Sequence, residues 1–103
     1  MRRPEIVSKI AKTMKLHFPE VETILYGSEA RGEARADSDF DLLILLPDGV
    51  ESFYEEYDRI SERLFNIELE TGANITSTLH RKSEWGRSRN PFYYNVKNEG
   101  IRL

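Results

Sequence analysis

An apolar run from Phe40 to Leu46 constrains the fold of this chain more than any other segment, because only Asp41 interrupts it. A continuous apolar stretch of this length is typical of a strand that is buried on both faces of a sheet. The Pro-Asp-Gly sequence at 47–49 follows directly and predicts the turn that ends the strand. Such a strand needs other strands beside it and helices packed on it, so the sequence predicts a layered fold.

The rest of the chain shows the periodicities of helices and short strands. Apolar residues recur at helical spacing between Ile6 and Phe18, and the strongest helical pattern lies between Phe53 and Ile67. The expected elements, in order, are a helix at 4–17, a strand at 21–26, a short helical turn within 28–38, a strand at 40–46, a helix at 51–69, a strand at 73–80, a short helix at 83–85 and a last helix from 91 to near 100. This order predicts a single α/β or α+β domain over residues 1–103, with a small sheet of three to four strands.

Composition excludes several classes of protein. The chain carries 15 basic and 18 acidic residues, and the net charge of −3 argues against general nucleic-acid binding. It has no cysteine, which excludes disulfides and thiolate zinc sites and fits a cytoplasmic location. Arg2 and Arg3 are not followed by an apolar stretch, so we expect no signal peptide, and no segment has the apolar length of a membrane span.

Gly27 and Ser28 follow the first predicted strand. Glycine allows a sharp turn and a close approach of the backbone to a ligand. A serine that opens a helical turn supplies a hydroxyl group beside backbone N–H groups, and this combination suits a phosphate oxygen. Taken alone, the pair is a weak signal for phosphate binding, because many proteins use it as an ordinary turn with a helix cap.

Asp39 and Asp41 are two positions apart at the start of the central strand, so their side chains point to the same face. Two carboxylates at the edge of buried apolar structure repel each other and are costly to desolvate. A divalent cation removes that cost, and Mg²⁺ often binds one or two carboxylates together with substrate phosphates. The alternative is that both residues lie in an exposed loop and Asp39 is a turn residue.

The two features together favour a functional site. Ten residues separate Ser28 from Asp39, so adjacent strands would bring the phosphate-binding turn and the carboxylate pair to one end of the sheet. Phosphoryl and nucleotidyl transfer require this arrangement, in which a metal bridges phosphates that a turn holds in place.

The segment GSEARGEARADSDFD resembles the signature of the DNA polymerase beta-like nucleotidyltransferase superfamily in its minimal, MNT-type form. That signature is Gly-Ser, ten residues, then Asp-x-Asp, and Gly27-Ser28 and Asp39-Phe40-Asp41 match it without gaps. The resemblance implies a small mixed sheet with helices mainly on one face and the active site at its edge.

The resemblance also implies an activity and a set of roles. Relatives transfer a nucleoside monophosphate from an NTP, usually ATP, to a hydroxyl group. Asp39 and Asp41 would then be the catalytic, metal-binding residues for two Mg²⁺ ions, with Mn²⁺ as an alternative. Gly27 and Ser28 would hold the β- and γ-phosphates. Arg31 would join this nucleotide site or brace the turn by pairing with a nearby carboxylate.

The match ends at the third carboxylate that active relatives carry on a later strand. The predicted strand at 73–80 has no Asp or Glu, and Asn74 or Thr76 stands where one is expected. Glu68 or Glu70 could supply the group if the long helix ends early, although a place in its last turn is the simpler interpretation.

Two hypotheses therefore remain. The chain is a nucleotidyltransferase whose acceptor arrives on a partner, as the resemblance to antitoxins that pair with small helical HEPN-type proteins implies. Alternatively, it is a catalytically inactive module that binds a nucleotide or a partner. Proximity of a third acidic group to Asp39 and Asp41 would favour the enzyme.

Overall fold

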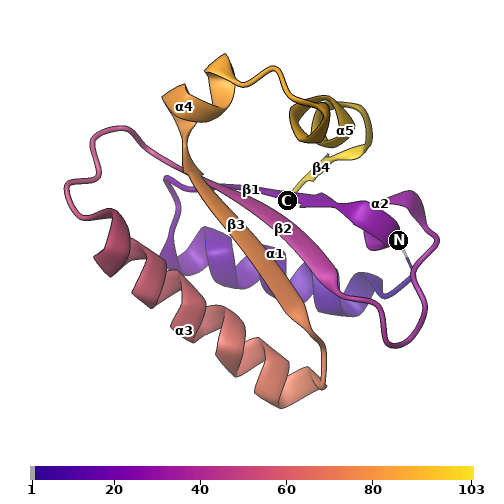
Figure 1. The fold of residues 1–103 in the computed structure, drawn as a ribbon. Helices are drawn as coiled ribbons and strands as arrows, with labels where there is room; N and C mark the ends of the chain where they lie inside the picture. The colour runs from indigo at the N-terminus through magenta and orange to yellow at the C-terminus, as the bar shows by residue number, and fades with distance from the viewer. Residues whose placement is uncertain (1) are drawn as a thin grey trace.

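The computed structural model describes residues 2–103 as one mixed sheet with helices on both faces (Figure 1). The elements, in chain order, are α1 (Pro4–His17), β1 (Glu22–Tyr26), α2 (Gly27–Arg31), β2 (Phe40–Leu46), α3 (Phe53–Thr71), β3 (Ile75–Arg81), α4 (Lys82–Arg87), α5 (Pro91–Glu99) and β4 (Ile101–Arg102). The sequence predicted these elements with boundary shifts of about two residues, apart from β4, which is too short to leave a periodic pattern.

The strands lie in the order β3-β2-β1-β4. Strand β2 is antiparallel to β1 and parallel to β3, and β4 pairs antiparallel with the outer side of β1. The sheet is therefore mixed, as expected. Because β1 runs opposite to β2 and β3, the end of β1 meets the beginnings of β2 and β3 at the same end of the sheet.

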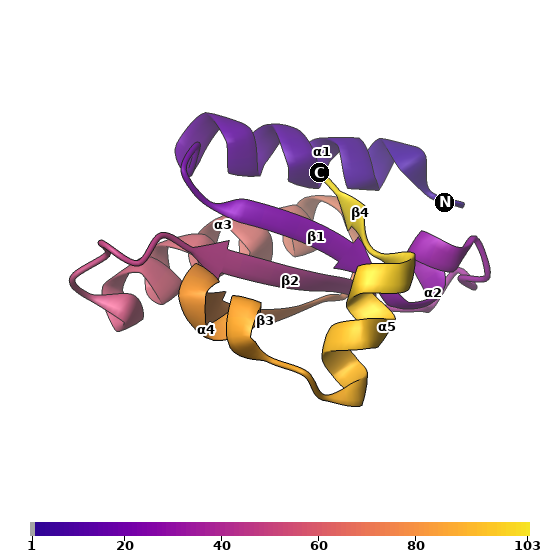
Figure 2. The same ribbon diagram turned by 90° about the horizontal axis from the view of Figure 1, so that it is seen from above.

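The main core lies between the sheet and the two longest helices. Figure 2 shows α1 and α3 on one face of the sheet, and α4 and α5 on the other. Alternate residues of β2 point to these two faces, and all of its apolar side chains are buried. Phe40, Leu42, Ile44 and Leu46 join the larger core under α1 and α3, whereas Leu43 and Leu45 meet Val96 of α5 in a smaller cluster.

Helix boundaries follow ordinary capping chemistry. Ser52 accepts a hydrogen bond from the Glu55 N–H at the start of α3, and Gly72 ends the helix with φ of 74°. Asn90 accepts from the Tyr93 N–H at the start of α5, where Pro91 is the first helical residue. These caps set where α3 and α5 begin and where α3 ends.

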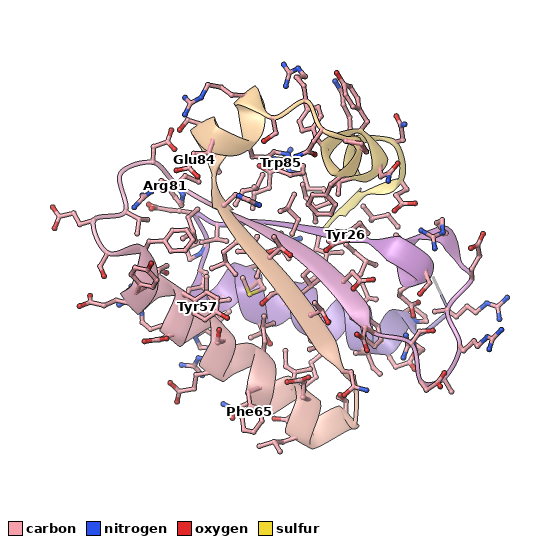
Figure 3. All side chains as sticks on the ribbon, in the orientation of Figure 1. Tyr26, Tyr57, Phe65, Arg81, Glu84 and Trp85 are labelled. Atoms are coloured by element: carbon pink, nitrogen blue, oxygen red, sulfur yellow. The ribbon has the colours of Figure 1, made fainter. Side chains whose placement is uncertain are left out.

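Aromatic residues of α4 and α5 pack against the smaller cluster. Trp85 and Phe92 pack with their ring centroids 5.6 Å apart, and Phe92 packs on Tyr26 at 5.2 Å. Figure 3 shows Trp85 pointing from α4 towards the sheet and Tyr26 at the end of β1. Packing against the sheet thus accounts for Trp85 and Phe92, whereas Tyr94 of α5 is 47% exposed.

None of the helices among residues 2–103 is long and apolar enough to cross a membrane.

Candidate active site

The candidate site lies at the end of the sheet where β1 ends and β2 and β3 begin. In the sheet register, Tyr26 is paired with Asp41, and Asp41 is paired with Thr76. Paired residues point to the same face, which here is the face covered by α4 and α5. Figures 1 and 2 both place α2 and the end of α5 beside this end of the sheet.

Gly27 and Asp41 are in close contact across the β1–β2 pair. Gly27 has φ of 78°, a left-handed conformation that favours glycine. A Cβ atom at this position would lie 3.2 Å from the Asp41 carboxyl carbon and closer still to its Oδ2 oxygen. The chain therefore enters α2 directly beside Asp41, one of the two predicted metal ligands.

We expect Gly27→Ala to weaken binding of Mg²⁺ and an ATP analogue by about tenfold, because its methyl group displaces the Asp41 carboxylate. Alanine is strained in this left-handed conformation, so the substitution should also lower the free energy of unfolding by about 1–2 kcal/mol. Isothermal titration calorimetry and urea denaturation measure the two effects.

Gly72→Ala is the matched control for that substitution. Gly72 has φ of 74°, and a Cβ atom there would meet nothing within 4 Å. It should lower stability similarly and leave binding unchanged. Equal binding losses in both variants would show that backbone strain, rather than the contact with Asp41, accounts for the result.

Asp39 and Asp41 are two neighbouring carboxylates whose repulsion is only partly offset by nearby positive charge. Burial raises the pKa of Asp41, and the charge of Asp39 raises it further. The Arg31 guanidinium opposes this shift, and the Glu99 carboxylate adds to it. The pKa of Asp41 therefore stays above its ordinary value, because its carboxylate is partly desolvated and faces a second carboxylate.

Thr76 is the β3 residue beside this pair. Its hydroxyl group donates to Asp39 Oδ2 at 3.1 Å. Asn74 precedes β3 and accepts a hydrogen bond from the Phe40 N–H through its backbone carbonyl. Thr76 thus places a neutral hydroxyl group beside Asp39, on the strand where the family resemblance led us to expect a third carboxylate.

Glu68 and Glu70 do not complete the site. Both lie in the last turns of α3, which packs on the opposite face of the sheet. Glu68 accepts a hydrogen bond from the Ile75 N–H at 2.9 Å, and Glu70 forms an ion pair with Lys9. The interpretation that places them in the helix is correct, because α3 continues to Thr71.

Glu99 is an acidic residue near the site that sequence reasoning missed. It is the last residue of α5, and its Oε1 accepts a hydrogen bond from the Gly27 N–H at 3.2 Å. Its Oε2 accepts from Arg31 Nη1 at 3.0 Å. Nothing local in the sequence marks Glu99, because 72 positions separate it from Gly27.

Arg31 braces the turn through two carboxylates, those of Glu33 and Glu99. Both hydrogen bonds raise the pKa of Arg31 above its ordinary value. The predicted brace is therefore present. Its guanidinium group also lies close enough to lower the pKa of Asp41, so it shares the electrostatic environment of the carboxylate pair.

Asp39 and Asp41 are by themselves an incomplete set of ligands for a metal ion. Within residues 2–103, no group of three or more His, Cys, Asp or Glu side chains is arranged to hold a metal ion. Asp39 and Asp41 would supply two protein ligands, and phosphate oxygens and water would supply the others, as is common for Mg²⁺.

Sequence comparison identifies the class of protein that this fold and site define. The sequence profile of the nucleotidyltransferase domain matches residues 7–93, so the chain belongs to that family. A search of curated protein sequences gives no match.

Solved structures share this fold. A candidate minimal nucleotidyltransferase is 23% identical, with a TM-score of 0.68, over 100% of this chain and 97% of its own. A candidate nucleotidyltransferase from Sulfolobus solfataricus is 17% identical, with a TM-score of 0.61, over 98% of this chain and 78% of its own. A toxin-antitoxin complex with AMP-PNP contains a chain that is 16% identical, with a TM-score of 0.62, over 92% of this chain and 69% of that one.

Proposed function

We propose that this domain transfers a nucleoside monophosphate, AMP from ATP, to a hydroxyl group on a partner protein in a reaction that depends on Mg²⁺. The contact between Gly27 and the Asp41 carboxylate is the observation that carries the proposal. It joins a turn suited to phosphate with a carboxylate pair suited to Mg²⁺. Neither feature alone would distinguish transfer chemistry from ordinary structure.

The reaction balances without a further reactant. The acceptor oxygen forms a bond to the α-phosphorus of ATP, the bond from that phosphorus to the bridging oxygen breaks, and pyrophosphate leaves. Mg²⁺, when bound, neutralises charge on the phosphates. The chain's own part is to hold the metal through Asp39 and Asp41 and the outer phosphates through the Gly27-Ser28 turn. The hydroxyl proton passes to solvent.

The proposed acceptor is a small helical protein of the HEPN type, for which this chain would act as antitoxin. Structural similarity to chains from toxin-antitoxin complexes supports a protein partner. Large apolar side chains on the outer surface of α3 also support it, since Tyr54, Phe65 and Leu69 are 80%, 56% and 68% exposed.

The test is a titration of the protein with Mg²⁺ and AMP-PNP, followed through amide chemical shifts by NMR. We expect shifts centred on Gly27, Ser28 and residues 39–41 that require Mg²⁺. The same titration of the Asp39→Asn/Asp41→Asn double variant should leave these resonances unchanged. Transfer is then sought with α-labelled ATP and candidate acceptor proteins.

Absence of shifts at millimolar nucleotide would contradict the proposal for this chain alone. Shifts that persist in the double variant would show that AMP-PNP binds elsewhere. Either result would direct attention from transfer to partner binding.

A catalytically inactive binding module is the second candidate function. The neutral Thr76 favours it, because this residue pairs with Asp41 where a third carboxylate would stand. Such a module would show the same Mg²⁺-dependent shifts and no incorporation of label from α-labelled ATP into any acceptor.

A further inference from the structure

Glu29 is a fully buried carboxylate two positions after Gly27. Its side chain is 0% exposed, and it accepts hydrogen bonds from the Arg2 N–H at 2.5 Å, the Arg3 N–H at 2.9 Å and Arg3 Nε at 2.8 Å. An unpaired carboxylate in this environment would be strongly destabilising. Burial alone would raise the pKa of Glu29, but these hydrogen bonds outweigh it and hold the pKa below its ordinary value.

The Arg3 guanidinium group extends this network to the loop before Asp39. Its Nη1 donates to the Ala36 carbonyl at 3.3 Å, and its Nη2 donates to the Ser38 carbonyl at 2.9 Å. The same group lies 3.9 Å from the centre of the Phe40 ring. One side chain, itself only 15% exposed, thus contacts residues immediately before and after Asp39.

These contacts join the two halves of the motif through a third segment of the chain. Glu29 belongs to the helical turn that Gly27 and Ser28 open, and the Ser38 carbonyl belongs to the peptide group that leads into Asp39. The planar fork of arginine can bond both sides at once, whereas the ammonium group of lysine cannot reproduce that geometry.

We propose that Arg3 is a positioning residue, anchored by Glu29, that fixes the Asp39 ligand relative to the Gly27-Ser28 turn. The inference rests on the proposed function, since it assigns Arg3 to the metal and nucleotide site without contact with either. Arg3 acts on Asp39 through backbone carbonyls, so a substitution that keeps a positive charge beside Glu29 should alter the site more than it alters the fold.

Arg3→Lys is the first test, and Arg2→Lys is its matched control. The Arg2 guanidinium donates to the Gly32 carbonyl, and its backbone N–H still reaches Glu29 after substitution. Outer partners of metal ligands commonly contribute about tenfold or more to metal affinity. We therefore expect Arg3→Lys to raise the Kd for Mg²⁺ with AMP-PNP about tenfold, and Arg2→Lys to leave it within about twofold.

Two further readouts separate positioning from plain stabilisation. Mn²⁺ alone should broaden the Asp39 and Asp41 amide signals of the wild type at lower concentration than those of Arg3→Lys. Amide exchange of residues 36–40 should accelerate in Arg3→Lys while exchange within α3 does not. A lower melting temperature with unchanged Kd, broadening and local exchange would overturn the proposal.

The same measurements distinguish failure of this inference from failure of the proposed function. If the wild type binds neither Mn²⁺ nor Mg²⁺ with AMP-PNP, the proposed function fails, and local exchange at 36–40 decides whether Arg3 holds the loop. Should Arg3→Lys not fold, Arg3→Gln combined with Glu29→Gln provides an uncharged pair for the same tests.

Discussion

Asp41→Asn should bind Mg²⁺ with AMP-PNP at least about a hundredfold more weakly than the wild type, because a neutral amide replaces one of the two protein ligands that we propose. The same substitution should make the metal-free protein more stable by up to about 1 kcal/mol near neutral pH. Removing a charge that is desolvated and faces Asp39 relieves an unfavourable interaction. Binding by calorimetry and unfolding by urea measure the two opposite effects.

The pH dependence of that stability difference follows from the direction of the Asp41 pKa shift. The pKa of Asp41 is higher in the folded protein than in the unfolded chain. Between these two values the folded state binds more protons, so wild-type stability falls as pH rises through this window. The advantage of Asp41→Asn should be absent below the unfolded pKa of about 3.9 and complete above the folded pKa.

Asp58→Asn on the exposed surface of α3 is the control for the general effect of removing one negative charge. It should not show the same gain in stability with rising pH. Mg²⁺ with AMP-PNP should reverse the order of stability, because at about a hundred times its Kd a ligand stabilises a protein by about 2.7 kcal/mol. A metal-free Asp41→Asn variant that is less stable than the wild type at every pH would refute the electrostatic argument.

The sequence predicted the contact between the two motif halves because both lie at the ends of strands. Gly27 directly follows β1 and Asp41 lies at the start of β2, so any antiparallel pairing of these strands brings them together. The spacing of ten residues leaves room for little besides α2 and a short loop. The proximity of Gly27 and Asp41 could therefore be predicted without knowing how distant parts of the chain pack.

The groups that surround this pair could not be predicted, because distant segments supply them. Glu99 reaches Gly27 because α5 packs on the sheet through Val96, which contacts Leu43 and Leu45. No local sequence pattern predicts how a helix packs on a sheet. Arg3 appeared in the sequence only as an N-terminal basic residue. Its role depends on Glu29, whose place in a charged and exposed-looking segment gave no sign of complete burial.

Thr76→Asp should raise the rate of AMP transfer or ATP hydrolysis by about a hundredfold, which is the lower range for a well-placed general base. Thr76 is paired with Asp41 across the β2–β3 register, and its hydroxyl already contacts Asp39. A carboxylate there would supply the third acidic group that the family resemblance led us to expect on this strand. It could accept the proton of the attacking hydroxyl, which the wild-type strand leaves to solvent.

Thr76→Asn is the matched control, because it has the shape of aspartate without the charge and should not raise the rate. Pyrophosphate release from ATP, or conversion of α-labelled ATP to labelled AMP or AMP-glycerol, measures the reaction with water or glycerol as acceptor and without a known partner. The metal-free Thr76→Asp protein should be less stable than the wild type, since three carboxylates then share one edge of the sheet, and Mg²⁺ should recover that loss.

Tighter Mg²⁺ binding without faster pyrophosphate release would show that a missing base is not what limits transfer, and the binding-module hypothesis would gain support. Faster release would show that this site already contains the remaining parts of a nucleotidyltransferase.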